Sequence, residues 1–282
     1  MKLVRFGPAG KERPGLLDAD GKLRDLSRKV KDIDGAALAP AKLKELAKLD
    51  TRKLPLVKGR PRLGPCVATP SKFVAIGLNY TDHAKETGSP IPEYPVVFFK
   101  SQTCIVGPYD SVMIPKDSTQ LDWEVELGLV IGRTARHVPV ADALKYVAGY
   151  CIVNDISERD FQLKKSASQW NKGKGCDTFG PIGPWLVTTD EIRDPQNLDM
   201  WLDVNGERRQ TGNTRTMIFG VAAVVADVSK YMTLLPGDVI TTGTPPGVGL
   251  GQKPNPIYLK DGDVMELAIE GLGAQRQVCK QA

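Results

Sequence analysis

Two glutamates stand in a stretch that otherwise has the composition of a buried β-strand, LDWEVELGLVIG at residues 121–132. Because alternate side chains of a strand point to the same face, Glu124 and Glu126 share one face and lie about 7 Å apart. Asp155 ends a second apolar segment, YCIVN, and can meet the two glutamates if the two strands are neighbours. Three carboxylates without cysteine or histidine suit a hard cation such as Mg²⁺ or Mn²⁺.

These carboxylates also have ordinary structural explanations. Glu124 and Glu126 fit the solvent-facing side of an edge strand, and Asp155 fits a charge at the N-terminus of a helix. Ser157 and Asp160 resemble a helix-capping pair, which places the start of that helix directly after the strand. Spacing alone leaves the metal site and these alternatives open.

A second group of candidate residues lies in GLNYTDHAKETG at 77–88. If the chain turns helical after Tyr80, His83 and Glu86 share a helix face, so the carboxylate can orient the imidazole. Such a pair can take a proton from water. A surface histidine that merely lies near a glutamate has the same spacing. The polar segment 88–95 that follows is a candidate lid over a substrate.

The cysteines indicate neither zinc nor a redox couple, because they are widely spaced and form no CxxC pair. Reduced thiols are expected at Cys66, Cys104, Cys151, Cys176 and Cys279. A cysteine nucleophile would need one of only two histidines, His83 and His137, as its partner. Cys176 is the only plausible candidate for that role.

Composition is that of an ordinary globular protein, with 41% hydrophobic and 25% charged residues in 282. No apolar run reaches the roughly 18 residues of a membrane span, and the N-terminus has no signal-peptide core. We therefore expect a cytoplasmic protein. Residues 1–65 hold 17 Lys/Arg against 8 Asp/Glu, but without interleaved aromatic residues. A solvated surface explains them better than a nucleic-acid site.

Element patterns predict a small N-terminal domain at 1–65 and a catalytic domain at 66–282, because PLVKGRPRLGP interrupts the pattern between them. The first contains a hairpin at 13–27, turning at Asp20–Gly21, and a helix at 41–50. In the second, helices are expected at 140–150 and 218–232. Strands are expected at 73–80, 96–99, 121–132, 150–156, 198–206, 238–243 and 263–271. Turn signals between the strands favour a mostly antiparallel α+β domain.

Eight motifs, in order, resemble the fumarylacetoacetate hydrolase family over residues 70–275. They are GLNYTDHAKE, VVFFKSQTCIVGP, DWEVELGLVIG, VNDISERDFQ, WNKGKGCDTFGPIGPW, VNGERRQTGNTRTMIF, PGDVITTGTPPGVG and DGDVMELAIEGLG. The resemblance implies an α+β fold with a mixed β-roll core, here with a small N-terminal α/β appendage. It also implies that Glu124, Glu126 and Asp155 bind Mg²⁺ or Mn²⁺.

The same resemblance implies roles for further residues. His83 and Glu86 match a catalytic dyad carried by the lid, and Lys174 matches an active-site lysine, with Lys172 as its rival. Four further positions match residues that contact substrate in the family, namely Lys100, Arg159, Gln162 and Thr244. The chain departs from the family's Lys-Pro motif, since Ser101 follows Lys100. The resemblance therefore does not predict the shape of that loop or its substrate contacts.

The implied activity is a metal-dependent hydrolysis of the C3–C4 bond of a 2,4-diketo acid, giving pyruvate and a carboxylic acid. The N-terminal segment resembles the subgroup that acts on 2,4-diketo-3-deoxy-L-fuconate or L-rhamnonate. Alternatives within the family are an oxaloacetate decarboxylase and a 2-hydroxyhepta-2,4-diene-1,7-dioate isomerase. A nucleic-acid-binding or scaffold protein would require Glu124, Glu126 and Asp155 to lie apart.

Family members are usually homodimers, so the resemblance implies a homodimer that binds a small-molecule substrate and neither nucleic acid nor membrane. The apolar segment FGVAAVVADVSKYM fits either the core or a subunit interface.

Overall fold

The strand that contains Glu126 and directly follows Glu124 lies inside a large sheet, with a neighbouring strand on each side. In this computed structural model, which describes residues 1–282 apart from the side chain of Thr87, β9 (Val125–Ile131) pairs with two strands. They are β10 (Val147–Asn154) and β15 (Val239–Thr241). All residues of β9 are buried. The edge-strand explanation of Glu124 and Glu126 is therefore wrong.

The main sheet has ten strands. Nine follow one another in the order β3 (Leu23–Asp25), β2 (Arg13–Leu17), β1 (Lys2–Phe6), β12 (Gly180–Thr188), β10, β9, β15, β4 (Phe73–Gly77) and β5 (Val96–Lys100). The tenth strand, β6 (Ile105–Val106), pairs with β12. Most pairs are antiparallel, and the parallel ones are β4 with β15 and β6 with β12.

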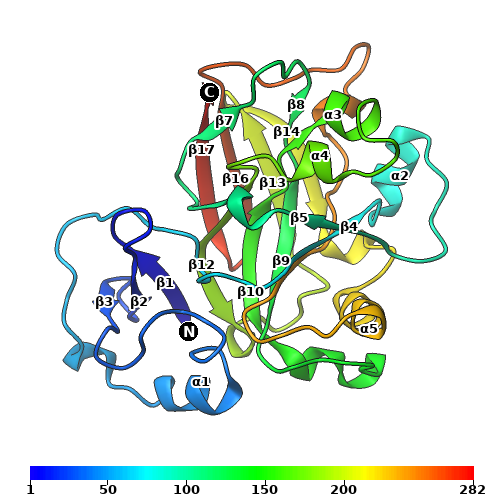
Figure 1. Cartoon of the computed structure of the whole chain (residues 1–282). Coiled ribbons are helices and arrows are strands. Elements are labelled where there is room, and N and C mark those ends of the chain that lie inside the picture. The colour runs from blue at the N-terminus through cyan, green and yellow to red at the C-terminus, as the bar shows by residue number, and fades with distance from the viewer.

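A second sheet covers the strands that carry the acidic residues. Its order is β14 (Glu207–Asn213), β13 (Asp199–Val204), β16 (Val264–Ile269), β17 (Gly273–Gln281) and β7 (Val112–Ile114). In Figure 1 these strands stand beside β9, β10 and β12, and buried glutamines join the two sheets. Gln210 accepts a hydrogen bond from the Val125 amide, and Gln277 accepts one from Asn154. A two-stranded ribbon joins β8 (Leu121–Asp122) to β11 (Ser157–Glu158).

Helices are few and short, which confirms the predicted α+β class. They are α1 (Pro40–Leu46), α2 (Thr81–Thr87), α3 (Arg159–Leu163), α4 (Asn171–Lys174) and α5 (Val221–Tyr231). The helix predicted at 140–150 is wrong in type and extent. A 3₁₀ segment runs over Val140–Tyr146, and β10 begins at Val147. Pairing with β9 and β12 draws these apolar residues into the sheet because both of its faces are buried there.

Strand β12 was not predicted, because its sequence GPIGPWLVT carries two prolines and two glycines. Such residues weaken a strand unless they stand at an irregularity or at a close approach. Here the register between β10 and β12 shifts at Tyr150 and Ile152, and Ile152 faces Gly183, which precedes Pro184. The irregular pairing accommodates the prolines within the sheet.

The N-terminal segment joins the main sheet directly. The predicted hairpin is confirmed as β2 and β3, and Gly21 has the positive φ of +73° that its turn requires. Strand β1 pairs with β12, with Lys2 opposite Val187. Residues 1–65 lie to one side of the molecule in Figure 1. Their description as a separate domain stays a prediction.

Helix α5 contributes its apolar face to the core, through Val221, Val224, Val225 and Val228. The core explanation of this segment therefore holds, whereas the homodimer stays a prediction. No helix in the part of the chain that the structure describes is long and apolar enough to cross a membrane.

Close packing of β10 against β12 depends on Gly149. A Cβ at this position would lie 2.3 Å from the backbone oxygen of Val187, which cannot move without disturbing the strand pair. We expect Gly149→Ala to lower the free energy of unfolding by about 1–3 kcal/mol, measured by chemical denaturation. Gly64→Ala is the comparison variant and should cost less, because the atoms nearest its methyl group all belong to a side chain, that of Glu12, and not to a backbone. An equal loss in both variants would contradict the backbone explanation.

Candidate active site

Glu124, Glu126 and Asp155 meet where β9 begins and β10 ends. The strand register places Val125 opposite Asn154, and the Asp155 amide donates to the Glu124 carbonyl oxygen at 2.9 Å. Carboxylate oxygens of the three acids lie within 4.8 Å of one another, and all three side chains are buried. We call these residues the acidic cluster. The alternative of a nucleic-acid or scaffold protein required them to lie apart, so its condition is not met.

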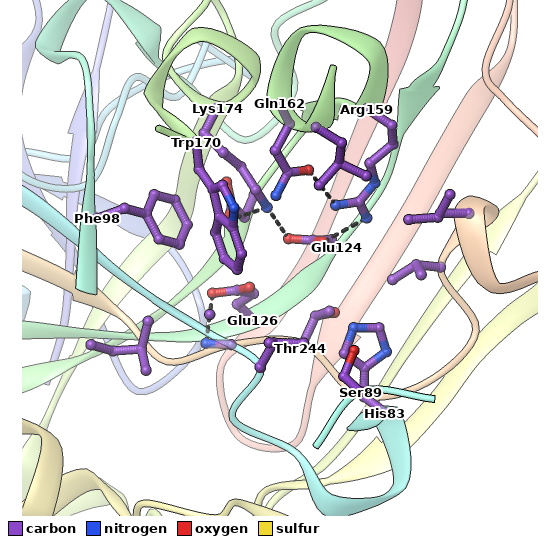
Figure 2. Close-up of a pocket in the computed structure, with 18 residues that line it drawn as sticks. His83, Ser89, Phe98, Glu124, Glu126, Arg159, Gln162, Trp170, Lys174 and Thr244 are labelled. Atoms are coloured by element: carbon purple, nitrogen blue, oxygen red, sulfur yellow. Dashed lines mark hydrogen bonds and ion pairs between the residues drawn. The ribbon is translucent and has the colours of Figure 1, made fainter. Parts of the chain in front are cut away.

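Two basic side chains compensate Glu124. Lys174 Nζ donates to Glu124 Oε2 at 2.5 Å and to Asp155 Oδ2 at 2.9 Å, while the Arg159 guanidinium donates to Glu124 Oε1 at 2.6 Å (Figure 2). Burial would raise the pKa of Glu124, but the charges of Lys174 and Arg159 outweigh it and lower this pKa to about 2. Burial also works against the charged form of Lys174, yet Asp155 and Glu124 raise its pKa. Lys174 is therefore an ammonium ion.

Glu126 differs from its neighbours because its hydrogen-bond donors are neutral. Its Oε2 accepts from Thr241 Oγ1 at 2.5 Å and from the Gly243 amide at 2.9 Å. Burial, together with the charges of Asp155 and Glu124, raises the pKa of Glu126 well above its ordinary value. The cluster therefore carries one carboxylate that the protein leaves without a cationic partner among the residues described.

This donor set fits a divalent cation of the hard type. It offers only carboxylate oxygens, which Mg²⁺ and Mn²⁺ prefer. The charge balance also fits a cation, because acidic side chains outnumber the basic side chains that contact them. The acids are Asp122, Glu124, Glu126 and Asp155, and the bases are Lys100, Arg159 and Lys174. A bound cation would favour the ionised form of Glu126 and compensate its charge.

The predicted helix after Tyr80 is confirmed as α2, which ends at Gly88 with a φ of +67°. One helical turn brings His83 Nδ1 within 3.0 Å of Glu86 Oε2. The other oxygen of Glu86 accepts from the Gly247 amide at 2.8 Å. His83 is buried, and its ring faces the cavity from the side opposite Lys174 and Gln162 (Figure 2).

One cavity of about 260 Å³ collects most of the predicted site residues. Those that line it are His83, Glu124, Glu126, Asp155, Arg159, Gln162, Lys174 and Thr244. The other two stand one layer behind. Glu86 lies behind His83, and Lys100 lies behind the acidic cluster, where its Nζ donates to Asp155 Oδ1 at 2.5 Å. Lys100 therefore reaches the cavity only through Asp155, and its role as a substrate contact stays a prediction.

Helices α3 and α4 pack closely and so direct Lys174 into the cavity. A Cβ at Gly173 would lie 2.4 Å from the Glu158 carbonyl oxygen, so glycine permits this approach. The rival lysine, Lys172, is exposed, and its Nζ donates to the Lys165 carbonyl oxygen. Cys176 donates to the Lys172 carbonyl oxygen and does not line the cavity, and burial raises its thiol pKa. Neither Lys172 nor Cys176 belongs to the site.

The predicted capping pair Ser157 and Asp160 is wrong. Ser157 belongs to β11, and its hydroxyl donates to the Asp155 carbonyl oxygen. Glu158 caps α3 instead, accepting from the Phe161 amide at 2.7 Å. Asp155 precedes this helix by four residues and is engaged by two lysines, so it is not a helix N-terminal charge.

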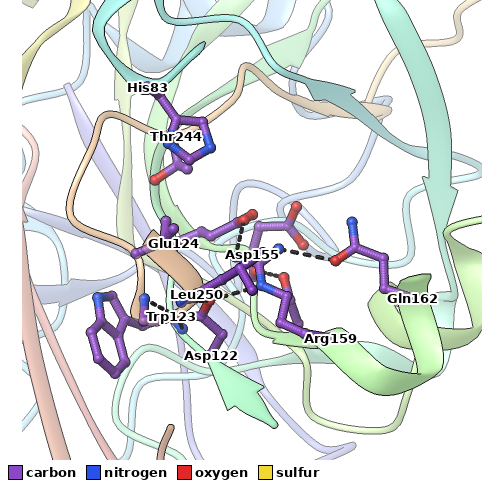
Figure 3. A network of polar contacts seen from close by, with 12 residues as sticks. His83, Asp122, Trp123, Glu124, Asp155, Arg159, Gln162, Thr244 and Leu250 are labelled. Carbon is purple, nitrogen blue, oxygen red and sulfur yellow. Dashed lines mark hydrogen bonds and ion pairs between the residues drawn. The ribbon is translucent and has the colours of Figure 1, made fainter. Parts of the chain in front are cut away.

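Asp122 is a buried member of the site that the sequence analysis missed. Its carboxylate accepts from Arg159 Nε at 2.8 Å, and from the amides of Gly249 at 2.6 Å and Leu250 at 3.0 Å (Figure 3). The alternation that singled out Glu124 and Glu126 includes Asp122 as well, so the signal was present. Asp122 fixes the guanidinium that contacts Glu124.

Aromatic residues form another wall of the cavity that was not predicted. Phe98 and Trp170 meet edge to face with centroids 5.3 Å apart. The Trp170 ring lies over Gly77, where a Cβ would come within 2.2 Å of it. Lys174 Nζ lies 5.4 Å from the Phe98 ring centroid, at cation–π distance. Trp170 had no distinguishing pattern in sequence, because its partners come from distant segments.

A buried oxygen cluster facing a histidine–glutamate pair across one cavity is typical of an enzyme active site. The family model described as fumarylacetoacetate (FAA) hydrolase C-terminal matches residues 72–279. The chain therefore belongs to the fumarylacetoacetate hydrolase family. This confirms the resemblance drawn from the motifs.

Individual relatives match along their whole length. A protein of Burkholderia multivorans, named provisionally as a hydrolase, is 60% identical over 282 residues, covering 100% of both chains. The solved fumarylacetoacetate hydrolase of psychrophilic Exiguobacterium antarcticum is 37% identical, with a TM-score of 0.86 and 100% of both chains covered. The solved maleylpyruvate hydrolase of Sphingobium sp. SYK-6, in complex with manganese(II) ion and pyruvate, is 29% identical, with a TM-score of 0.82 and 100% of both chains covered.

Glu126 provides a direct test of the metal site. Because its folded-state pKa is raised, this carboxyl group costs stability at neutral pH, where the unfolded chain ionises freely. Glu126→Gln should therefore raise the free energy of unfolding of the metal-free protein at neutral pH. Wild type should gain about 2.7 kcal/mol from Mg²⁺ or Mn²⁺ at a hundred times the dissociation constant.

The variant should lose most of this metal-dependent gain, measured by thermal unfolding with the metal and with a chelator. Glu86→Gln is the matched control, since Glu86 lies outside the cluster and should leave the response to metal intact. An unchanged metal response in Glu126→Gln would contradict the assignment of Glu126 as a ligand.

Proposed function

We propose that this protein is a metal-dependent hydrolase that cleaves the C3–C4 bond of a 2,4-diketo acid, giving pyruvate and a carboxylic acid. The observation that supports this best is the placement of His83, held by Glu86, and the acidic cluster on the walls of one cavity. The solved maleylpyruvate hydrolase in complex with manganese(II) ion and pyruvate supports a site of this fold that takes a divalent cation and pyruvate.

Glu124, Glu126 and Asp155 would hold Mg²⁺ or Mn²⁺. When bound, the cation would supply Lewis-acid stabilisation of negative charge on the substrate oxygens. Lys174 is positioned to assist, because its ammonium group contacts Glu124 and Asp155 and also lines the cavity. Lys100 supports the cluster from behind through Asp155.

His83 would activate the water. Because an ionised Glu86 can only accept, Nδ1 would carry the proton in their contact, and Nε2 would then be the atom that takes a proton from water. The water oxygen then bonds to C4, and the C3–C4 bond breaks with its electron pair moving to C3 and the C2 oxygen. Addition of one proton at C3 completes pyruvate, and C4 leaves as the carboxylic acid. The Lys174 ammonium would stabilise the developing oxyanion or supply that proton.

Substrate positioning falls to the polar residues around the cluster. Arg159 Nη1 donates to Gln162 Oε1 at 3.0 Å, so both side chains are held in place at the cavity wall. The Thr244 hydroxyl donates to the Val125 carbonyl oxygen at 3.0 Å and accepts from Gln210 at 2.8 Å. These contacts fix Thr244 next to the strand that carries the glutamates.

Two observations bear on the tail of the substrate. The resemblance of the N-terminal segment favours a 2,4-diketo-3-deoxy-L-fuconate or L-rhamnonate. The cavity wall away from the cluster is apolar and favours a tail with fewer hydroxyl groups. It is formed by Ile76, Leu78, Phe98, Leu163, Trp170, Val248 and Leu250. A substrate panel should therefore include both kinds of tail.

Removing the base separates hydrolysis from decarboxylation of oxaloacetate, which needs no attacking water. His83→Ala should lower pyruvate release from 2,4-diketo acids in the presence of Mg²⁺ by about 10²–10⁴-fold. Any release from oxaloacetate should fall much less. Glu86→Ala should act in the same direction with a smaller effect, because Glu86 orients the base without taking the proton.

The other histidine supplies the control. His137 is exposed and does not line the cavity, so His137→Ala should leave both activities unchanged. If both activities fell together in His83→Ala, or if oxaloacetate were the better substrate of the wild type, the decarboxylase would replace the hydrolase. Conversion of 2-hydroxyhepta-2,4-diene-1,7-dioate without pyruvate release would identify the isomerase instead.

A further inference from the structure

The turn formed by Gly247–Gly251 contacts Glu86, the residue that holds His83. We call it the glycine turn. The Gly247 amide donates to Glu86 Oε1 at 2.8 Å, while Glu86 Oε2 faces His83 Nδ1 at 3.0 Å. The two oxygens of Glu86 therefore connect the glycine turn to the imidazole. The glycine turn takes part in these contacts only through a backbone amide, so it has no side chain there that could act in the reaction itself.

The same turn is fixed to the strand segment that carries the acidic cluster. Asp122 accepts from the Gly249 amide at 2.6 Å and from the Leu250 amide at 3.0 Å (Figure 3). Trp123 Nε1 donates to the Gly247 carbonyl oxygen at 3.1 Å. Asp122 and Trp123 immediately precede Glu124. The glycine turn is thus tied to the same short segment that begins the cluster.

Gly251 leaves the space that Glu86 occupies. A Cβ at Gly251 would lie 2.7 Å from the carboxylate carbon of Glu86 and 2.9 Å from each of its oxygens. These atoms are the far end of a flexible side chain, so an added methyl group would displace Glu86 and leave the backbone in place. Gly251 also has no positive φ that would strain alanine.

We propose that the glycine turn is a positioning element that sets the orientation of His83 relative to the acidic cluster by holding Glu86. Gly247 supplies the hydrogen bond, Gly251 supplies the space, and Asp122 supplies the anchor. This inference rests on the proposed function only where it gives His83 the role of base. The geometry of the positioning can be tested without any substrate.

The two histidines of the chain make the imidazole signals in NMR a simple readout, with His137 as an internal reference. Gly251→Ala should move the His83 signals in the same direction as Glu86→Ala, because both remove the acceptor that fixes Nδ1–H. The double variant should show no further change, since Glu86 transmits the effect. His137 should not respond. Circular dichroism and the melting temperature confirm that each variant is folded.

Gly64→Ala is the matched control. Its methyl group would also displace a glutamate, with 2.8 Å to Glu12 Oε1, but in the N-terminal segment. It should leave the His83 signals and the activity unchanged. Gln252→Ala gives a second route if Gly251→Ala does not fold. Gln252 donates to the carbonyl oxygens of Gly247 and Val248, so its loss loosens the turn and should move the same signals less.

Activity provides an independent readout. On the 2,4-diketo acid that wild type hydrolyses, Gly251→Ala should lower kcat by about 10²-fold, the loss typical of a misplaced catalytic group. It should leave metal binding unchanged, and it should cost nothing further in the Glu86→Ala background. Unmoved His83 signals in folded Gly251→Ala, or additive effects in the double variant, would overturn the proposal. A third outcome is that the His83 signals respond non-additively to Gly251→Ala and Glu86→Ala while the wild type hydrolyses no diketo acid. That outcome would support the positioning and overturn the proposed function instead.

Discussion

Burial of three carboxylates at one point is the constraint on which the rest of the site depends. An unpaired carboxylate in a dry interior is costly enough that the fold must supply partners. The sheet supplies the acids at the start of β9 and the end of β10, whereas α3 and α4 supply Arg159 and Lys174. The ion pairs therefore join two layers of the structure. The packing of α3 on α4 at Gly173 serves the same end, because it sets the position of Lys174.

The three acids of the acidic cluster are not equally paired with cations, so one side of the site lacks a positive charge. Lys174 contacts two of the acids, and Lys100 and Arg159 each contact one of those same two, while Glu126 receives only a hydroxyl and an amide hydrogen. The carboxyl group that no cation contacts thus lies on the side of β15 and Gly243. Under the proposed function, a divalent cation and a substrate carboxylate together bring the assembled site close to neutrality. Chelation of an anionic substrate is then favoured without a large buried net charge.

Features that depend on local spacing could be predicted from the sequence. The alternation of Glu124 and Glu126, and the helical spacing of His83 and Glu86, both reflect backbone periods that hold in any fold. Positions that depend on distant partners could not be predicted in the same way. Lys100 was assigned to the substrate because nothing local shows that Asp155 lies in front of it. The 140–150 segment has a helical pattern, yet its last four residues belong to β10, which pairs with β9 and β12.

Strand β1 is synthesised well before its partner in the main sheet, β12, since Lys2 pairs with Val187. During synthesis the β1–β2–β3 unit can fold early, because its own pairings are local. The outer side of β1 then stays an open edge until β12 has left the ribosome. For much of translation the nascent chain therefore exposes a strand edge of the kind that promotes aggregation. The proline- and glycine-rich β12 is the segment that ends this exposure.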